Sequence, residues 1–223
     1  MELCFSHPRF RGLFWAQTLG ALNDNIFKNA LVILVLYRGW SVAGVSPESF
    51  AVLAGAIFIL PFLLFSAQAG QMADRMDKAD LVRKLKSLEL LVSLVAVVGL
   101  LGHRVDVLLL ALFGYATQAA LFGPVKYAIL PQILDPDELL SGNALVETAT
   151  SMAILIGTMT GGILAARSPF EVAVVVLVLS ILGRVVATPI PAAPPIGEIS
   201  RRTFWQAQGE GLRLTWQTRP MLL

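Results

Sequence analysis

Cysteine and charged residues are scarce in this sequence, and each shortage excludes a class of protein. The 223 residues include a single cysteine, Cys4, which excludes an intrachain disulfide and a cysteine-based metal cluster. Only 14% of the residues are charged, whereas about a quarter are charged in an ordinary soluble domain. The net charge of +2 is too small to indicate a surface for nucleic acid, so we expect no nucleic-acid partner.

The sequence also lacks the motifs of soluble enzymes. Its two histidines, His7 and His103, are far apart in the chain and do not form a catalytic pattern. The G-x-S-x-G motif, the G-x-G-x-x-G motif and a phosphate-binding glycine loop are all absent. We therefore expect that the chain is not an enzyme, and that it has no catalytic residues, no metal site and no cofactor.

Long apolar stretches are what the sequence does have, since 56% of its residues are hydrophobic. A membrane-spanning helix needs about 20 mostly apolar residues to cross roughly 30 Å of hydrocarbon. Six stretches meet this requirement: 13–36, 50–70, 84–102, 106–130, 141–166 and 169–190. The sequence predicts an all-α membrane protein whose six transmembrane helices form one bundle. The first stretch is too long and too charged at its centre for a cleaved signal peptide.

The basic residues predict the orientation of these spans. Loops on the cytoplasmic side of a membrane carry an excess of Lys and Arg. The alternate loops contain only Arg38, Arg104 and Arg167, and most of the remaining bases lie near the other loops and the two ends. Both termini are therefore predicted to be cytoplasmic, with residues 1–12 as the N-terminal segment and 191–223 as a linker. The bases that support this orientation are Arg9, Arg11, Arg75, Lys78, Arg83, Lys84, Lys86, Arg201, Arg202, Arg213 and Arg219.

Polar residues interrupt the first span in "LGALNDNIFKNALVIL", at Asn23, Asp24, Asn25, Lys28 and Asn29. Charges near the centre of a bilayer are costly and usually face protein or a water-filled cavity. At about 100° per residue, Gln17, Asp24 and Lys28 share one stripe of the helix, while Asn23 points elsewhere. Asp24 and Lys28 are four residues apart and can neutralise each other. Either the stripe lines a cavity that binds a polar head group or a coupling ion, or it only joins helices together.

A second polar group lies in the fourth and fifth spans. Pro124, next to Gly123, removes a backbone donor and is expected to open the helix locally near Lys126. Lys126 either binds a phosphate or carboxylate, or extends toward the membrane surface. Glu147 either pairs with Lys126, takes up a proton, or interacts favourably with the positive N-terminus of its helix.

Three further features have local explanations. The stretch "GTMTGG", with Gly157 and Gly161, is typical of close helix packing. Arg184 lies near the end of the sixth span and is expected to extend toward the surface. Gly70, Asp74 and Arg75, in "GQMADRMDKADLVRKLK", either belong to an ordinary basic loop or clamp helix ends in one state of a transporter.

The order Gly70-x-x-x-Asp74-Arg75 resembles the signature loop of the major facilitator superfamily, although that signature continues with Gly and basic residues where this chain has Asp77 and Lys78. The stretches "LGALNDNIFKNAL", "GPVKYAILPQI" and "SGNALVETATSMAILIGTMTGG" resemble the lysophospholipid transporter branch of that superfamily. This branch includes members fused to an acyltransferase and an acyl-carrier-protein synthetase. The resemblance implies movement of lysophospholipids, such as lysophosphatidylethanolamine, across the bacterial inner membrane for re-acylation.

The resemblance also implies site residues and a larger assembly. Asp24, Lys126 and Glu147 would handle the head group, while Asn25 and Lys28 belong to the same motif as Asp24. The superfamily fold has two six-helix bundles, so we expect this chain to be the N-terminal half. Its bundle, 13–190, would contain two three-helix repeats, 13–102 and 106–190. The partners would be a lysophospholipid, membrane lipids, a second half in cis or trans, and possibly an acyltransferase.

Two other functions fit the same residues. A proton-coupled exporter of small amphipathic compounds would use Asp24 or Glu147 as its proton carrier. A non-transporting membrane scaffold would present a lipid acyltransferase with its substrate, and its buried charges would be dispensable.

Overall fold

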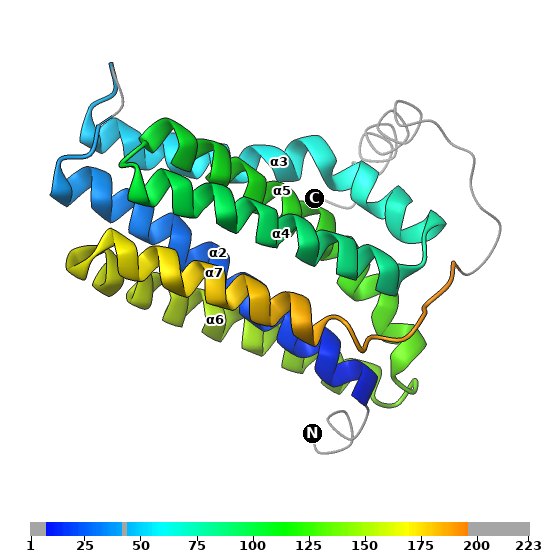
Figure 1. Cartoon of the computed structure of the whole chain (residues 1–223). Coiled ribbons are helices and arrows are strands. Elements are labelled where there is room, and N and C mark those ends of the chain that lie inside the picture. Colours follow the sequence, from blue (N-terminus) through cyan, green and yellow to red (C-terminus); the bar gives the residue numbers. More distant parts are fainter. Residues whose placement is uncertain (1–7, 42–43, 196–223) are drawn as a thin grey trace, which may run out of the picture.

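Six long helices make up the part of the chain that the computed structural model describes, which is residues 8–41 and 44–195 (Figure 1). The predicted segments 1–12 and 191–223 lie partly outside these described residues. The helices are α2 (Pro8–Arg38), α3 (Pro47–Arg75), α4 (Lys78–Leu101), α5 (Val105–Ile133), α6 (Leu139–Arg167) and α7 (Pro169–Val186). Each predicted span overlaps one of them, and the described residues form no strand. The predicted all-α bundle is confirmed.

Short capping motifs set where several of these helices begin. The side chain of Ser46 accepts a hydrogen bond from the Ser49 amide, and Pro47 occupies the first turn of α3. Asp77 caps α4 in the same way, because its carboxylate accepts from the Asp80 amide at 2.9 Å. Ser168 followed by Pro169 repeats this arrangement at α7. A side-chain oxygen at the cap satisfies an otherwise unpaired amide, and proline at the first position loses no helical hydrogen bond.

The helices differ in how well they suit a membrane. Five of them, all except α4, are long and apolar enough to cross a bilayer. Helix α4 does not qualify because Lys84, Lys86 and Glu89 lie in every stretch of it that is long enough to span the bilayer. Helix α4 begins at Lys78, six residues before the predicted start of the third span. Lys86 was predicted to be a base of the cytoplasmic loop, and this is wrong: its side chain is 1% exposed inside the bundle.

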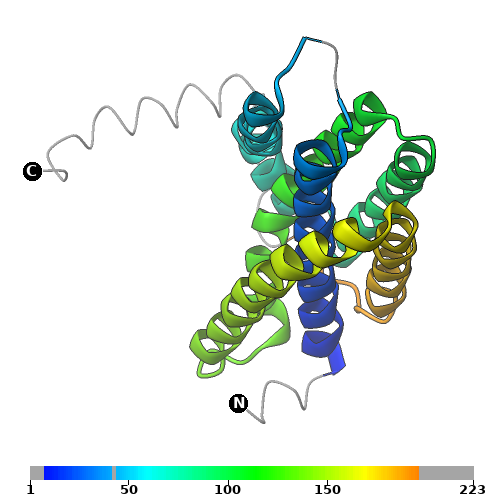
Figure 2. The same cartoon turned by 90° about the vertical axis from the view of Figure 1, so that its left-hand side faces the viewer.

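Helices α2 and α5 occupy the middle of the bundle. Helix α2 contacts α3, α5, α6 and α7, and α5 contacts α2, α3, α4 and α6. In Figure 2, α6 crosses α2 at an angle. The contacts repeat when α2, α3 and α4 are taken to correspond to α5, α6 and α7. The contact of α2 with α6 then corresponds to that of α5 with α3, and the contact of α2 with α7 corresponds to that of α5 with α4. Two three-helix repeats would produce such a pattern, and their presence stays a prediction.

Small residues bring α2 and α6 close together, as "GTMTGG" predicted. A Cβ atom on Gly157 would lie 2.8 Å from the Leu22 carbonyl oxygen, and one on Gly161 would collide with the Ile26 backbone. Only a residue without a side chain fits at this distance. The packing interpretation of the two glycines is therefore confirmed.

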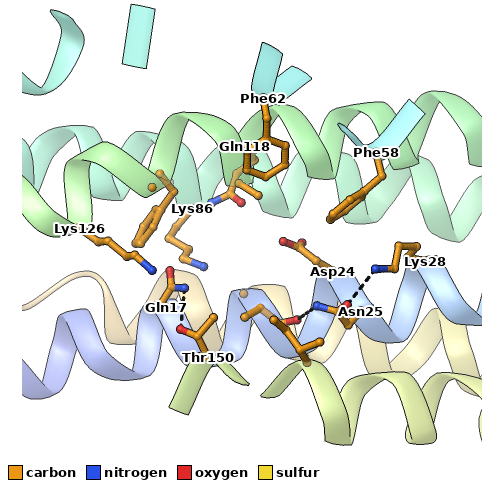
Figure 3. A pocket seen from close by; sticks show the side chains of 16 residues that line it. Gln17, Asp24, Asn25, Lys28, Phe58, Phe62, Lys86, Gln118, Lys126 and Thr150 are labelled. Carbon is orange, nitrogen blue, oxygen red and sulfur yellow. Dashed lines mark hydrogen bonds between the residues drawn. The ribbon is translucent and has the colours of Figure 1, made fainter. Parts of the chain in front are cut away.

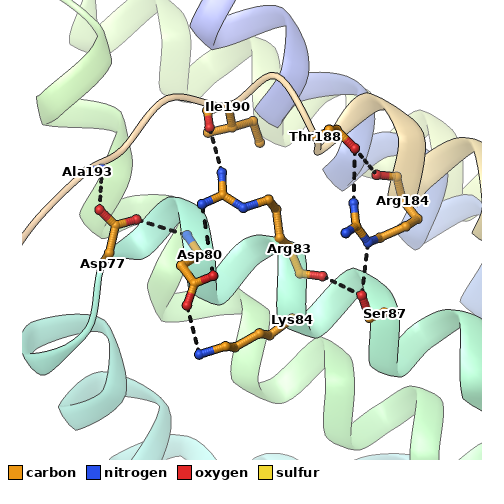
Figure 4. Close-up of polar contacts among 9 residues, drawn as sticks. All are labelled: Asp77, Asp80, Arg83, Lys84, Ser87, Arg184, Thr188, Ile190 and Ala193. Carbon is orange, nitrogen blue, oxygen red and sulfur yellow. Dashed lines mark hydrogen bonds and ion pairs between the residues drawn. The ribbon is translucent and has the colours of Figure 1, made fainter.

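The chain that leaves α7 is fastened to the beginning of α4 (Figure 4). The Ala193 amide donates to the Asp77 carboxylate at 2.8 Å, and Arg83 donates to the Ile190 carbonyl at 2.8 Å. Arg184 lies near this end, as predicted, but it does more than extend toward the surface. Its guanidinium donates to Ser87 of α4 at 2.9 Å and to Thr188 at 3.0 Å. These contacts join the first turns of α4 to the last turn of α7.

Candidate functional site

A cavity of about 320 Å³ lies between the helices, next to the polar stripe of α2 (Figure 3). Gln17, Asp24, Asn25 and Lys28 line it from α2, as the helical geometry predicted. Aromatic and aliphatic side chains form the remaining wall, including Phe58, Phe62, Phe122 and Ile154. The other polar residues that line the cavity are Lys86 of α4, Gln118 and Lys126 of α5, and Thr150 of α6.

Asp24 and Lys28 are close enough to interact electrostatically, as the sequence suggested, but they form no salt bridge. Lys28 donates instead to the Asn25 side-chain oxygen at 3.1 Å, and its ammonium lies 4.7 Å from the centre of the Phe58 ring. Asp24 is 5% exposed, and its Oδ1 has no hydrogen-bond partner. Figure 3 shows its carboxylate directed away from Lys28. A buried carboxylate oxygen without a donor indicates a group that is ready to accept one.

Two other amides of the first span contact neighbouring helices. Asn29 does not line the cavity, and it donates to Thr158 of α6 at 3.2 Å. Asn23 points elsewhere, as predicted, and donates to Glu89 of α4 at 3.3 Å. The polar residues of α2 therefore include residues that line the cavity and residues that join helices, and Gln17 does both because it donates to Thr150 of α6 at 3.1 Å. Binding of a head group or an ion by the cavity-lining residues stays a prediction.

Lys126 and Glu147 meet between α5 and α6. Their ammonium and carboxylate are 2.8 Å apart, and the Tyr127 hydroxyl donates to the same carboxylate oxygen at 2.6 Å. Of the three alternatives for Glu147, the pairing with Lys126 is confirmed. Lys126 is 7% exposed and lines the cavity, whereas the side chain of Glu147 is 51% exposed and does not line it. Helix α5 continues through Pro124, so the helix is not broken near Lys126, although proline supplies no amide donor for the Ala120 carbonyl.

A second ion pair, which is fully buried, was missed by the sequence analysis. The ammonium of Lys86 lies 2.6 Å from Glu89 Oε2, and both side chains are almost completely buried. A Cβ atom on Gly20 of α2 would lie 2.5 Å from this ammonium, which shows how closely α4 approaches α2 here. Two opposite charges three residues apart in the apolar stretch "LKSLELLVSL" were the signal that could have found the pair.

The residues of the signature loop lie outside the cavity. Gly70, Asp74 and Arg75 all belong to the last turns of α3, and only Met76 and Asp77 separate α3 from α4. A Cβ atom on Gly70 would meet nothing within 4 Å among the described residues, so this glycine makes no close helix contact there. Their clamping role stays a prediction.

Comparison with known proteins decides the family. The family model described as "Transmembrane secretion effector", of the major facilitator superfamily, matches residues 5–222. The chain belongs to the major facilitator superfamily. It is a multi-pass membrane protein, and its fold is that of one six-helix bundle of this superfamily. The resemblance noted in the sequence is confirmed.

The curated relatives include several proteins named lysophospholipid transporter LplT. The one from Serratia proteamaculans is 31% identical to this chain, covering 93% of the chain and 51% of the relative. The one from Klebsiella pneumoniae (strain 342) is 32% identical, with 81% and 43% covered. The one from Cronobacter sakazakii is 33% identical, with 67% and 35% covered. The chain thus spans about half the length, or less, of the curated relatives it matches.

Proposed function

We propose that this chain forms one half of a transporter that moves lysophospholipids across the bacterial inner membrane for re-acylation. The observation that carries the proposal is a cavity with charges of both signs and an aromatic wall. The unpartnered Asp24 carboxylate would bind the amine of a zwitterionic head group, and Lys126 would bind its phosphate. Phe58, Phe62 and Phe122 would contact the acyl chain.

The remaining site residues have supporting roles in this proposal. Asn25 holds Lys28 at the cavity wall, where Lys28 supplies a further positive charge. Glu147 would keep Lys126 charged when the cavity is empty and would release it to the phosphate of the substrate. An exchange of one partner for another avoids leaving a buried charge unpaired, which would be costly.

The proposal requires a second six-helix bundle, in cis or in trans. Superfamily transporters bind their substrate between two bundles and expose it alternately to either side. With both termini in the cytoplasm, Gly70, Asp74 and Arg75 would clamp the two bundles in one state. An acyltransferase on the cytoplasmic side would then consume the lysophospholipid.

A proton-coupled exporter of small amphipathic compounds is a second candidate, and one observation favours it. The buried Asp24 Oδ1 lacks a donor, as expected for a carboxyl group that binds and releases a proton. Transport that stops when the proton gradient is removed, with lysophospholipids left in their leaflet, would support this function.

Binding of single lipids to the purified chain tests the proposal. We expect Asp24→Asn and Lys126→Gln each to weaken binding of lysophosphatidylethanolamine at least about tenfold, because each removes a charge-assisted hydrogen bond. Lysophosphatidylglycerol has no amine, so Asp24→Asn should leave its binding almost unchanged while Lys126→Gln weakens it. Native mass spectrometry in detergent measures both lipids.

The matched control is Arg104→Gln, since Arg104 is paired with Asp106 at an exposed position away from the cavity. Equal binding of lysophosphatidylethanolamine by the wild type and both site variants would contradict the assignment of the head-group site. Full binding and full activity of every buried-charge variant would favour the scaffold function instead.

A further inference from the structure

A second concave site lies on the outside of the bundle, between α4 and α7 (Figure 4). It measures about 340 Å³ and shares no lining residue with the central cavity. Its apolar end is lined by Leu88 and Leu91, and its polar end by Asp80, Arg83, Lys84, Ser87 and Arg184. We refer to these seven residues as the α4–α7 groove.

We propose that the α4–α7 groove binds the head group of an anionic phospholipid whose acyl chains lie along α4 and α7. This inference does not depend on the substrate of the central cavity. It rests on the charge of the groove, on the way its arginines are held, and on its level in the membrane.

The groove carries more positive than negative charge. Asp80 also lines it and lies 2.7 Å from Lys84 and 4.0 Å from Arg83. One carboxylate facing three cations leaves a net charge of +2. A phosphodiester with no compensating amine is attracted to such a site, whereas the amine of a zwitterionic head group would be repelled.

The two arginines are held in position before any ligand arrives. Arg83 donates to the Ile190 carbonyl, and Arg184 donates to Ser87 and Thr188. A guanidinium has five N–H donors, and these contacts use only some of them. Among the described residues, Nη2 of Arg184 has no hydrogen-bond partner. Side chains that are already ordered lose little entropy when they bind an anion.

The level of the groove matches that of a lipid head group. Helix α7 has 18 residues, about 27 Å at 1.5 Å per residue, which nearly equals the hydrocarbon thickness. Arg184 lies in its last turn, and the bond to Ser87 places the neighbouring part of α4 at the same level. Basic pockets between membrane helices on the cytoplasmic side are typical sites for anionic head groups.

Apolar side chains continue from the groove toward the other end of both helices. Leu91 and Val98 of α4 are more than half exposed, and Leu182 and Val178 of α7 are nearly so. In a membrane, acyl chains cover such faces. The helix faces thus require a lipid, and the basic residues select its head group.

The experiment compares lipids on the purified full chain in detergent by native mass spectrometry. We expect phosphatidylglycerol and cardiolipin to bind at least about tenfold more tightly than phosphatidylethanolamine. The double variant Arg83→Gln/Arg184→Gln should lose this preference, whereas Arg104→Gln should keep it. Equal binding of the three lipids by the wild type, or an unchanged preference in the double variant, would overturn the proposal.

Two further variants apply if the double variant does not fold. Lys84 is 60% exposed, so Lys84→Gln leaves the packing intact and should weaken binding of phosphatidylglycerol severalfold. Asp80→Asn removes the competing carboxylate and should strengthen that binding. No change in either variant would refute the site. Displacement of phosphatidylglycerol by millimolar inorganic phosphate alone would assign the groove to a free anion and overturn the lipid proposal.

Discussion

Replacement of Lys86 by methionine is expected to destabilise the folded protein severely. Among the described residues, the variant would leave the buried Glu89 carboxylate with Asn23 as its one partner. Removal of one member of a buried ion pair costs about 3–5 kcal/mol, because the other charge remains buried and uncompensated. A folded domain is stable by only about 5–15 kcal/mol, so this loss is a large part of the total. The midpoint of unfolding, followed by tryptophan fluorescence during titration with SDS, measures it.

Lys84→Met is the matched control for this prediction. Lys84 lies two residues earlier on α4, and its side chain is 60% exposed and pairs with Asp80. Surface ion pairs contribute about 0–1 kcal/mol, so the control should unfold close to the wild type. A Lys86→Met variant as stable as this control would show that the buried pair contributes nothing to folding.

The double variant Lys86→Met/Glu89→Gln separates folding from function. It leaves no unpaired charge and should recover most of the lost stability, because neutral replacements of a buried pair are often well tolerated. Lys86 also lines the central cavity, so the folded double variant should bind lysophosphatidylethanolamine more weakly than the wild type. Wild-type binding by the double variant would assign the pair to folding alone.

Two neighbouring glycines of α6 are expected to respond to alanine in opposite directions. At Gly161 the new Cβ atom would meet the Ile26 backbone, with its Cα at 3.0 Å and its carbonyl carbon at 3.1 Å. Backbone atoms cannot move aside as a flexible side chain can, so α2 and α6 must separate. We expect Gly161→Ala to destabilise the bundle by about 1–3 kcal/mol, as overpacked cores do.

The control is Gly162→Ala, one residue further along the same helix. No atom of the described residues lies within 4 Å of a Cβ atom at Gly162. Alanine favours a helix over glycine by about 1 kcal/mol, so this variant should be slightly more stable than the wild type. The same SDS titration compares the two, and a Gly161→Ala variant that is not less stable than Gly162→Ala would show that α2 and α6 do not pack as described.

The charged residues show where sequence reasoning succeeded and where it failed. Helical geometry placed Gln17, Asp24 and Lys28 on one cavity-lining stripe, because the angle between residues of one helix is a local property. It could not choose a partner for Lys28, since Asn25 and Asp24 were both within reach. It also failed at Lys86, because a base near a predicted helix start looks the same whether it faces water or Glu89.

The sequence by itself determined the number and the approximate extent of the helices. A membrane selects segments by their apolar length, and that length can be counted along the chain. The predicted spans differ from the helices mainly at their ends, as at α4 and α7, because polar turns continue some helices beyond the apolar core while Pro189 and Pro191 end α7 early.

Only the tertiary structure decided which side chains meet. Lys126 with Glu147, Asn23 with Glu89, and Arg184 with Ser87 each join two helices. Their contacts depend on the distance between the helices and on the rotation of each helix about its axis. Close crossings, such as that of Gly161 against the Ile26 backbone, set both the distance and the rotation. Packing acts between segments far apart in the chain, so it cannot be predicted from the spacing of residues within one segment.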